Sequence, residues 1–184
     1  VESATRRGYD VLLMDTQIDP HFINALEQKL EKTSLKRVDA DTLDKLIDKG
    51  LNNESVLSGD DQTKLKELFE KTLNSATDRN KSLIINVESL PSDEFPVTIT
   101  MPEFMRRMKD MSALSGEQSM FGSMPETYNL AINANHPLTA KLLATADESL
   151  QQTLIKQLYD LALLSQNRLT GANLTAFVRR SVEQ

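Results

Sequence analysis

The sequence contains no cysteine. Disulfide bonds, thiol nucleophiles and thiolate metal sites are therefore excluded, and the absence fits a reducing compartment. The two histidines, His21 and His136, lie far apart, and no metal-ligand spacing links them. No phosphate-binding glycine loop and no G-x-G-x-x-G pattern follows the first apolar segment. We therefore expect no nucleotide site, metal site or cofactor in this chain.

Long apolar runs and an excess of positive charge are also missing. No run approaches the roughly 18–20 apolar residues that a transmembrane helix needs, and the first ten residues lack the apolar region of a signal peptide. The net charge is −6, which gives no reason to expect nucleic-acid binding, since that requires a basic face. We expect neither a membrane nor a nucleic acid as a partner. Since the chain opens without Met and runs at once into an apolar segment, we expect it to be a fragment of a longer protein.

Catalytic patterns are absent as well. No nucleophile-elbow glycines surround a serine, and His136-Pro137 is typical of a turn that enters a helix, so His136 is predicted to cap that helix. The acidic pairs Asp60-Asp61 and Asp93-Glu94 fall in predicted turns and helix starts, where solvated carboxylates are common. The sequence therefore predicts a protein that is not an enzyme in itself.

The first third of the chain predicts a small α/β unit. Residues 8–14 form a short apolar run typical of a strand buried on both faces, and residues 19–30 show helical periodicity. A second strand is predicted at 35–38 and a short helix at 41–48. Residues 49–61 are rich in Gly, Asn, Ser and Asp and are predicted to be a linker.

The remainder predicts a mixed α+β domain that ends in helices. A helix is expected from Asp60 or Asp61 to Leu73, followed by a hairpin of strands 83–87 and 95–100 whose second strand begins at a sheet edge because of Pro96. Further elements are predicted as a strand at 128–132 and helices at 138–146, 147–167 and 172–183. The fold class is therefore α+β overall.

The end of the 147–167 helix is apolar on nearly every side, from Leu161 to Leu164. A helix that is apolar all round must be buried all round, and one terminal helix cannot cover it. A second copy of the chain could, through an interface of about 1,500 Å² or more. The residues predicted to form this dimer interface are Leu154, Leu158, Leu161, Leu164, Leu174, Phe177 and Val178. For Leu154, packing within its own chain is the alternative.

Residues 101–125 hold six of the seven methionines. Methionine repacks around varied partners at low cost, so this stretch is either an unusual piece of core or a surface for irregular partners. We favour the surface, with some methionines remaining in the core. The residues predicted to contact such partners are Met101, Phe104, Met105, Met108, Met111, Leu114, Met120 and Phe121.

Three segments resemble the ninety-kilodalton heat-shock chaperone family, in its bacterial type. They are GYDVLLMDTQIDPHFINAL at 8–26, YNLAINANHPL at 128–138 and LYDLALLSQ at 158–166. The resemblance implies that residues 1–58 end the family's middle domain and that residues 61–184 are its C-terminal dimerisation domain. It also implies a cytoplasmic, stress-induced homodimer that binds partly unfolded client proteins, with the methionine-rich stretch as part of the client surface.

The resemblance implies, too, that ATP and magnesium bind in a separate N-terminal ATPase domain. The chain ends Ser181-Val182-Glu183-Gln184 rather than in Glu-Glu-Val-Asp, so partners that recognise that acidic tail are not expected. The alternative is a small α/β ligand-binding or catalytic module with a dimerisation appendage. Its site would lie at the C-terminal end of the 9–14 strand.

Overall fold

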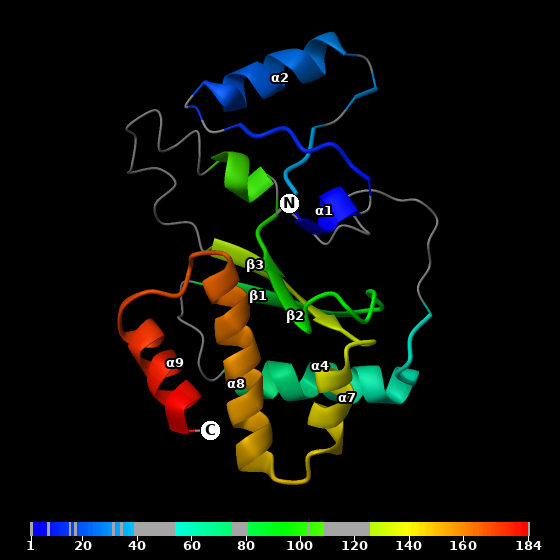
Figure 1. Ribbon diagram of the computed structural model, residues 1–184, viewed down its shortest axis with the longest axis vertical. Helices are drawn as coiled ribbons and strands as arrows, with labels where there is room; N and C mark the ends of the chain where they lie inside the picture. The colour runs from blue at the N-terminus through cyan, green and yellow to red at the C-terminus, as the bar shows by residue number, and fades with distance from the viewer. Residues whose placement is uncertain are drawn as a thin grey trace.

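The computed structural model describes residues 2–6, 8–14, 16, 18–30, 32–33, 35–38, 54–74, 81–102, 104–108 and 126–183. Helices and a small mixed sheet make up these residues, which confirms the α+β class (Figure 1). The elements are α1 (Glu2–Arg6), α2 (Asp19–Lys29), α4 (Gly59–Asn74), β1 (Lys81–Glu88), β2 (Val97–Thr100), β3 (Glu126–Asn133), α7 (Pro137–Ala144), α8 (Glu148–Ser165) and α9 (Gly171–Glu183). A further helical turn spans residues 104–108.

The strands within the described ranges form one sheet in the order β1-β3-β2. β3 runs parallel to β1 and antiparallel to β2. The predicted hairpin is therefore wrong, because β3 lies between the two strands that were expected to pair. The reason is visible in β3 itself: Leu130, Ala131 and Ile132 are all buried, so both faces are covered, as suits a central strand. The edge position predicted for the strand after Pro96 is confirmed.

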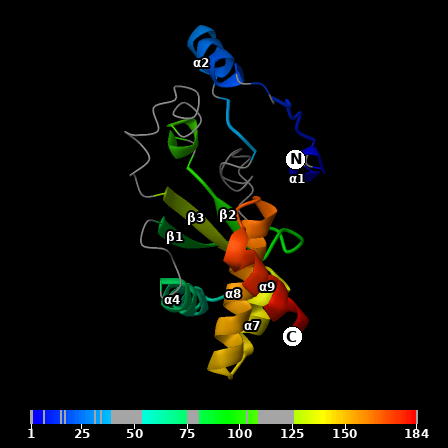
Figure 2. The ribbon, with the colours of Figure 1, turned by 90° about the vertical axis from the view of Figure 1, so that its left-hand side faces the viewer.

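Helices α4 and α8 cover the sheet and contact each other, α4 against β1 and α8 against β2. Figure 2 shows α4 and α8 on the same side of the strands, with α9 outside α8. One core joins these elements. Its largest fully buried side chains include Phe69 of α4, Leu130 of β3 and Ile155 of α8. Below the sheet, Gln151 Nε2 donates to the Leu142 carbonyl at 3.0 Å and so fixes α8 to α7.

The turn between β3 and α7 organises the neighbouring loops. The Asn135 amide donates to the carbonyls of Glu54 and Leu90 at 3.0 and 3.1 Å, and its oxygen accepts from the Val56 N–H at 2.8 Å. His136 Nδ1 accepts from the Leu138 N–H at 3.1 Å, which confirms the predicted helix cap. Burial lowers the pKa of His136 and so favours the neutral, accepting imidazole. The turn thus joins the entry to α4, the loop after β1 and the start of α7.

The N-terminal part differs more from the sequence prediction. Helix α2 is confirmed, but residues 8–14 and 35–38 form no strand, and Leu12 and Leu13 are 71% and 84% exposed. An apolar run becomes a strand only where another strand pairs with it, and none does so among the residues described. The predicted helix at 41–48 lies outside them. The boundary between domains 1–58 and 61–184 stays a prediction, and Glu54 and Val56 are attached to the sheet through Asn135.

Candidate functional site

Helices α8 and α9 form the first candidate surface. Asp147 caps α8, because its Oδ1 accepts from the N–H groups of Ser149 and Leu150 at 2.9 and 3.2 Å. Between the two helices, Arg180 pairs with Asp160 and donates to Gln157 Oε1 at 2.8 Å. These contacts hold α9 against α8 within one chain, so the Arg180 guanidinium is bound between the two helices.

The predicted dimer residues fall into two groups. Leu158 and Phe177 are buried within the chain, Leu154 packs partly buried against the core, and Leu174 is half-buried. The exposed group consists of Leu161, Leu164 and Val178, with exposed fractions of 46%, 38% and 52%. The second group is the part of the surface that a partner could cover.

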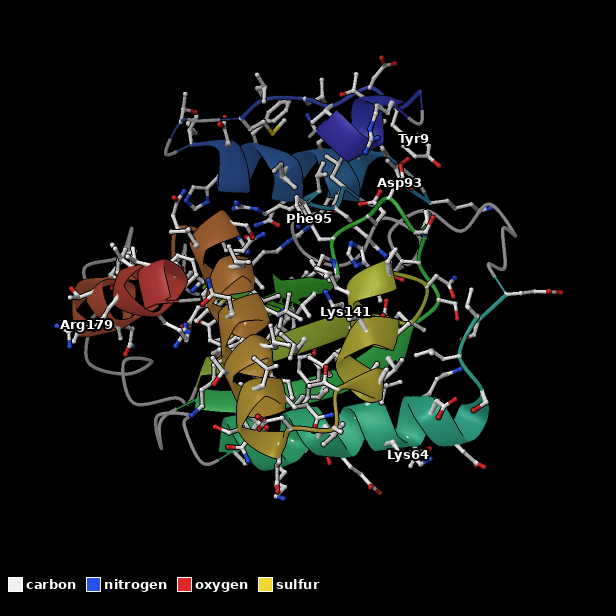
Figure 3. All side chains as sticks on the ribbon, turned by 60° about the horizontal axis from the view of Figure 1, so that its bottom comes forward. Tyr9, Lys64, Asp93, Phe95, Lys141 and Arg179 are labelled. Carbon is white, nitrogen blue, oxygen red and sulfur yellow. The ribbon has the colours of Figure 1, made fainter. Side chains whose placement is uncertain are left out.

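Sequence reasoning missed one member of this surface. Val182 is 82% exposed on α9, four residues after Val178 and therefore on the same side of that helix. The i, i+4 spacing was the signal that could have found it. Arg179 extends away from α8 in Figure 3, at the outer side of α9. Val178 and Val182 therefore form an exposed apolar pair on α9, beside the solvated guanidinium of Arg179.

The helical turn 104–108 forms the second candidate surface. Met101, just before it, is 2% exposed and belongs to the core, so a partner could reach it only if the core opened. Met105 packs partly buried against the same core, Met108 is half-buried, and Phe104 is 68% exposed. Of the other residues predicted for this surface, Met111, Leu114, Met120 and Phe121 lie outside the described part of the chain. The described part of the surface is therefore Phe104 with Met108.

Arg107 connects this turn to α2. Its guanidinium donates to Glu27 Oε2 at 3.0 Å and to Glu27 Oε1 at 3.3 Å. It also donates to Asn24 Oδ1 at 3.2 Å and to the Leu35 carbonyl at 3.0 Å. The Leu35 N–H in turn donates to Glu27 Oε1 at 2.7 Å. The two charged side chains and the Leu35 backbone therefore form a closed ring of hydrogen bonds.

This ring should make the contact between α2 and the turn sensitive to acid. The hydrogen bond from Arg107 and that from the Leu35 N–H lower the pKa of Glu27 below its ordinary value of 4.5. Because the folded pKa is the lower one, the ionised carboxylate stabilises the folded state above about pH 4.5, and this stability is lost as pH falls through the folded pKa. An NMR titration of the Glu27 carboxyl is expected to show a midpoint below 4.5 that rises in Arg107→Gln. An unchanged midpoint in the variant would contradict this attribution.

The remaining candidate groups show other roles. His136 serves the α7 cap, and His21 lies exposed on α2. Across the described ranges, no three His, Asp or Glu side chains gather closely enough to hold a metal ion. None of the helices that the structure describes is both long enough and apolar enough to cross a membrane.

Comparisons with known proteins agree with the resemblance. The family model described as "Hsp90 protein" matches residues 1–180. "Chaperone protein HtpG" of Porphyromonas gingivalis strain ATCC 33277 is 43% identical over 154 residues, which cover 84% of this chain and 22% of that protein. The protein of the same name from Bacteroides thetaiotaomicron is 37% identical over 143 residues, or 78% of this chain and 21% of its own length. The chain thus spans about a fifth of the length of the curated relatives it matches.

Proposed function

The chain belongs to the Hsp90 family, and from that premise we propose that it supplies the self-association and client-binding part of a cytoplasmic, ATP-dependent molecular chaperone. Its relatives of known name are chaperones, and this chain matches about a fifth of their length. ATP and magnesium binding are assigned to the remainder of such a protein. The observation that carries the proposal is the pair of exposed apolar surfaces, one on α8 and α9 and one on the turn 104–108.

Self-association is assigned to α8 and α9. These helices are held together by Arg180, Asp160 and Gln157, yet they leave leucine and valine side chains exposed on the outside. A symmetric pair of such surfaces buries each patch against its own copy. Sedimentation equilibrium of this chain over a wide dilution series should show a dimer at micromolar concentration. A monomer throughout would remove this half of the proposal.

Client binding is assigned to the turn 104–108. A client that exposes apolar side chains would contact Phe104 and Met108, while Met105 anchors the turn to the core. Two copies in a dimer would offer two such turns to one client and raise the apparent affinity through multivalency.

Phe104→Ser is expected to weaken the binding of an unfolded client about ten- to a hundredfold, since an apolar contact worth about 1.5–3 kcal/mol is lost. The measurement is the affinity for fluorescein-labelled, reduced and carboxymethylated α-lactalbumin, alongside suppression of heat-induced aggregation of an unrelated enzyme. Phe95→Ser is the matched control, because Phe95 is 69% exposed and Phe104 is 68% exposed. An equal effect of both substitutions would show that the turn has no special role.

The rival proposal is an α/β ligand-binding or catalytic module. Its site was expected at the end of a strand over residues 9–14, and this segment forms no strand. Binding of a nucleotide by this chain alone, measured by calorimetry, would favour the rival. The chaperone proposal would be favoured if the nucleotide gave no heat of binding and the client affinity depended on Phe104.

A further inference from the structure

The placement of α2 depends on polar contacts more than on apolar burial. None of the α2 side chains that the structure describes is buried, and Phe22 is 51% exposed. Helix α2 lies at the top of the molecule in Figure 1, with the green turn 104–108 between it and the sheet. The ring made by Arg107, Glu27 and Leu35 crosses from one to the other.

The turn 104–108 is too short to hold its own conformation, because a single helical turn fixes several residues for few hydrogen bonds. It is anchored on two sides, with Met105 against the core and Arg107 toward α2. On a helix, Phe104 lies beside both Arg107 and Met108, at the i+3 and i+4 spacings. The side chain that holds α2 is therefore a direct neighbour of the side chains proposed to hold a client.

The Arg107 guanidinium is well suited to linking the turn 104–108 to α2. It binds both oxygens of the Glu27 carboxylate, which fixes orientation as well as distance, and the two side chains are only 32% and 21% exposed. A shift of α2 would move Glu27 and the Leu35 carbonyl together, since Glu27 also accepts from the Leu35 N–H. The guanidinium, and with it the turn, would have to follow or lose these bonds.

From this geometry we propose that Arg107 is a positioning residue that couples the placement of α2 to the presentation of Phe104 and Met108. The inference rests on the proposed client-binding role of the turn and adds a regulation to it. When α2 is in place, the turn is fixed and its apolar face is preformed for a client. When α2 moves away, the turn loses the anchor that Arg107 provides, and the client pays the cost of ordering it.

Glu27→Gln is the central test, because Glu27 lies on α2 and not on the client turn. It keeps the shape of the side chain and removes its charge. We expect hydrogen–deuterium exchange to rise in residues 104–108 as well as in α2, with β1, β3 and α8 unchanged. The affinity for reduced, carboxymethylated α-lactalbumin should fall about three- to tenfold. The charge-swapped pair Glu27→Arg with Arg107→Glu should recover part of both losses.

The control is Arg6→Gln, which removes the ion pair of Arg6 with Asp93 at 3.4 Å. Both side chains of that pair are more than half exposed, and Figure 3 shows Asp93 on the loop beside Phe95. This variant should leave the client affinity and the exchange of 104–108 unchanged. An equal loss in Arg6→Gln, or unchanged exchange at 104–108 in Glu27→Gln, would overturn the coupling.

The two proposals can fail separately. If Phe104→Ser leaves client affinity unchanged, the client-binding role fails, while the exchange of 104–108 in Glu27→Gln still reports whether the turn depends on α2. If Phe104→Ser weakens client binding and Glu27→Gln does not, the client-binding role of the turn is supported and the coupling is refuted. In the Phe104→Ser background, Glu27→Gln should cause a smaller further loss of affinity than in the unmodified chain, because only Met108 remains to be positioned.

Discussion

Leu161→Asp combined with Leu164→Asp is expected to convert the chain from a dimer to a monomer at micromolar concentration. Both side chains are partly exposed on α8, 46% and 38%, so the folded monomer can accept a charge at either position. Covering each leucine is worth about 1 kcal/mol, and four such side chains meet in a symmetric dimer. The expected loss is therefore about 4 kcal/mol, or roughly a thousandfold in the dissociation constant.

Leu150→Asp is the matched control for this experiment. Leu150 is 47% exposed on the same helix but lies eleven residues from Leu161, about 16 Å along the axis. This variant should remain a dimer, and circular dichroism should show unchanged helix content in all three proteins. Sedimentation equilibrium decides the outcome. A double variant that still forms a dimer with unchanged affinity would place the self-association surface elsewhere on the chain.

The sequence predicted best where local pattern and final packing agree. The helices α4, α8 and α9 appear close to their predicted bounds, because the apolar stripes of α4 and α8 face the core and α9 packs against α8. The predicted hairpin was wrong because strand pairing is not decided by local sequence alone. β1 and β2 are neighbours in sequence, but they do not pair with each other. The buried, apolar strand β3 lies between them and pairs with both.

The interaction surfaces, too, could be predicted from the local sequence pattern only in part. Periodicity found the apolar faces around Leu161 and Phe104, but it could not separate Leu158 or Met101, which the chain buries itself, from their exposed neighbours. Nothing in the local sequence pattern around Arg107 indicates its role. Its partners Glu27 and Leu35 lie 80 and 72 residues away, so only the folded chain reveals the contact.

Asn133→Ala is expected to lower the free energy of unfolding by about 2–4 kcal/mol. The Asn133 side chain is fully buried; its amide donates to the Pro91 carbonyl at 2.8 Å, and its oxygen accepts from the Asn135 N–H at 3.0 Å. Alanine leaves both of these groups without that partner, at a cost of about 1–2 kcal/mol each, because Pro91 and Asn135 are half-buried. For a chain of this size, the melting temperature should fall by roughly 5–15 °C.

The effect should extend toward α8. The Asn133 backbone carbonyl, which the substitution keeps, accepts from Thr139 Oγ1 of α7 at 2.8 Å, so a shift of the turn would move α7, and α7 is bonded to α8 through Gln151. Urea unfolding at one fixed protein concentration is the measurement, since the stability of a dimer depends on concentration. Asn74→Ala, at the exposed last residue of α4, is the control and should change little. If Asn133→Ala were as stable as this control, the turn after β3 would not be the structural junction that its hydrogen bonds indicate.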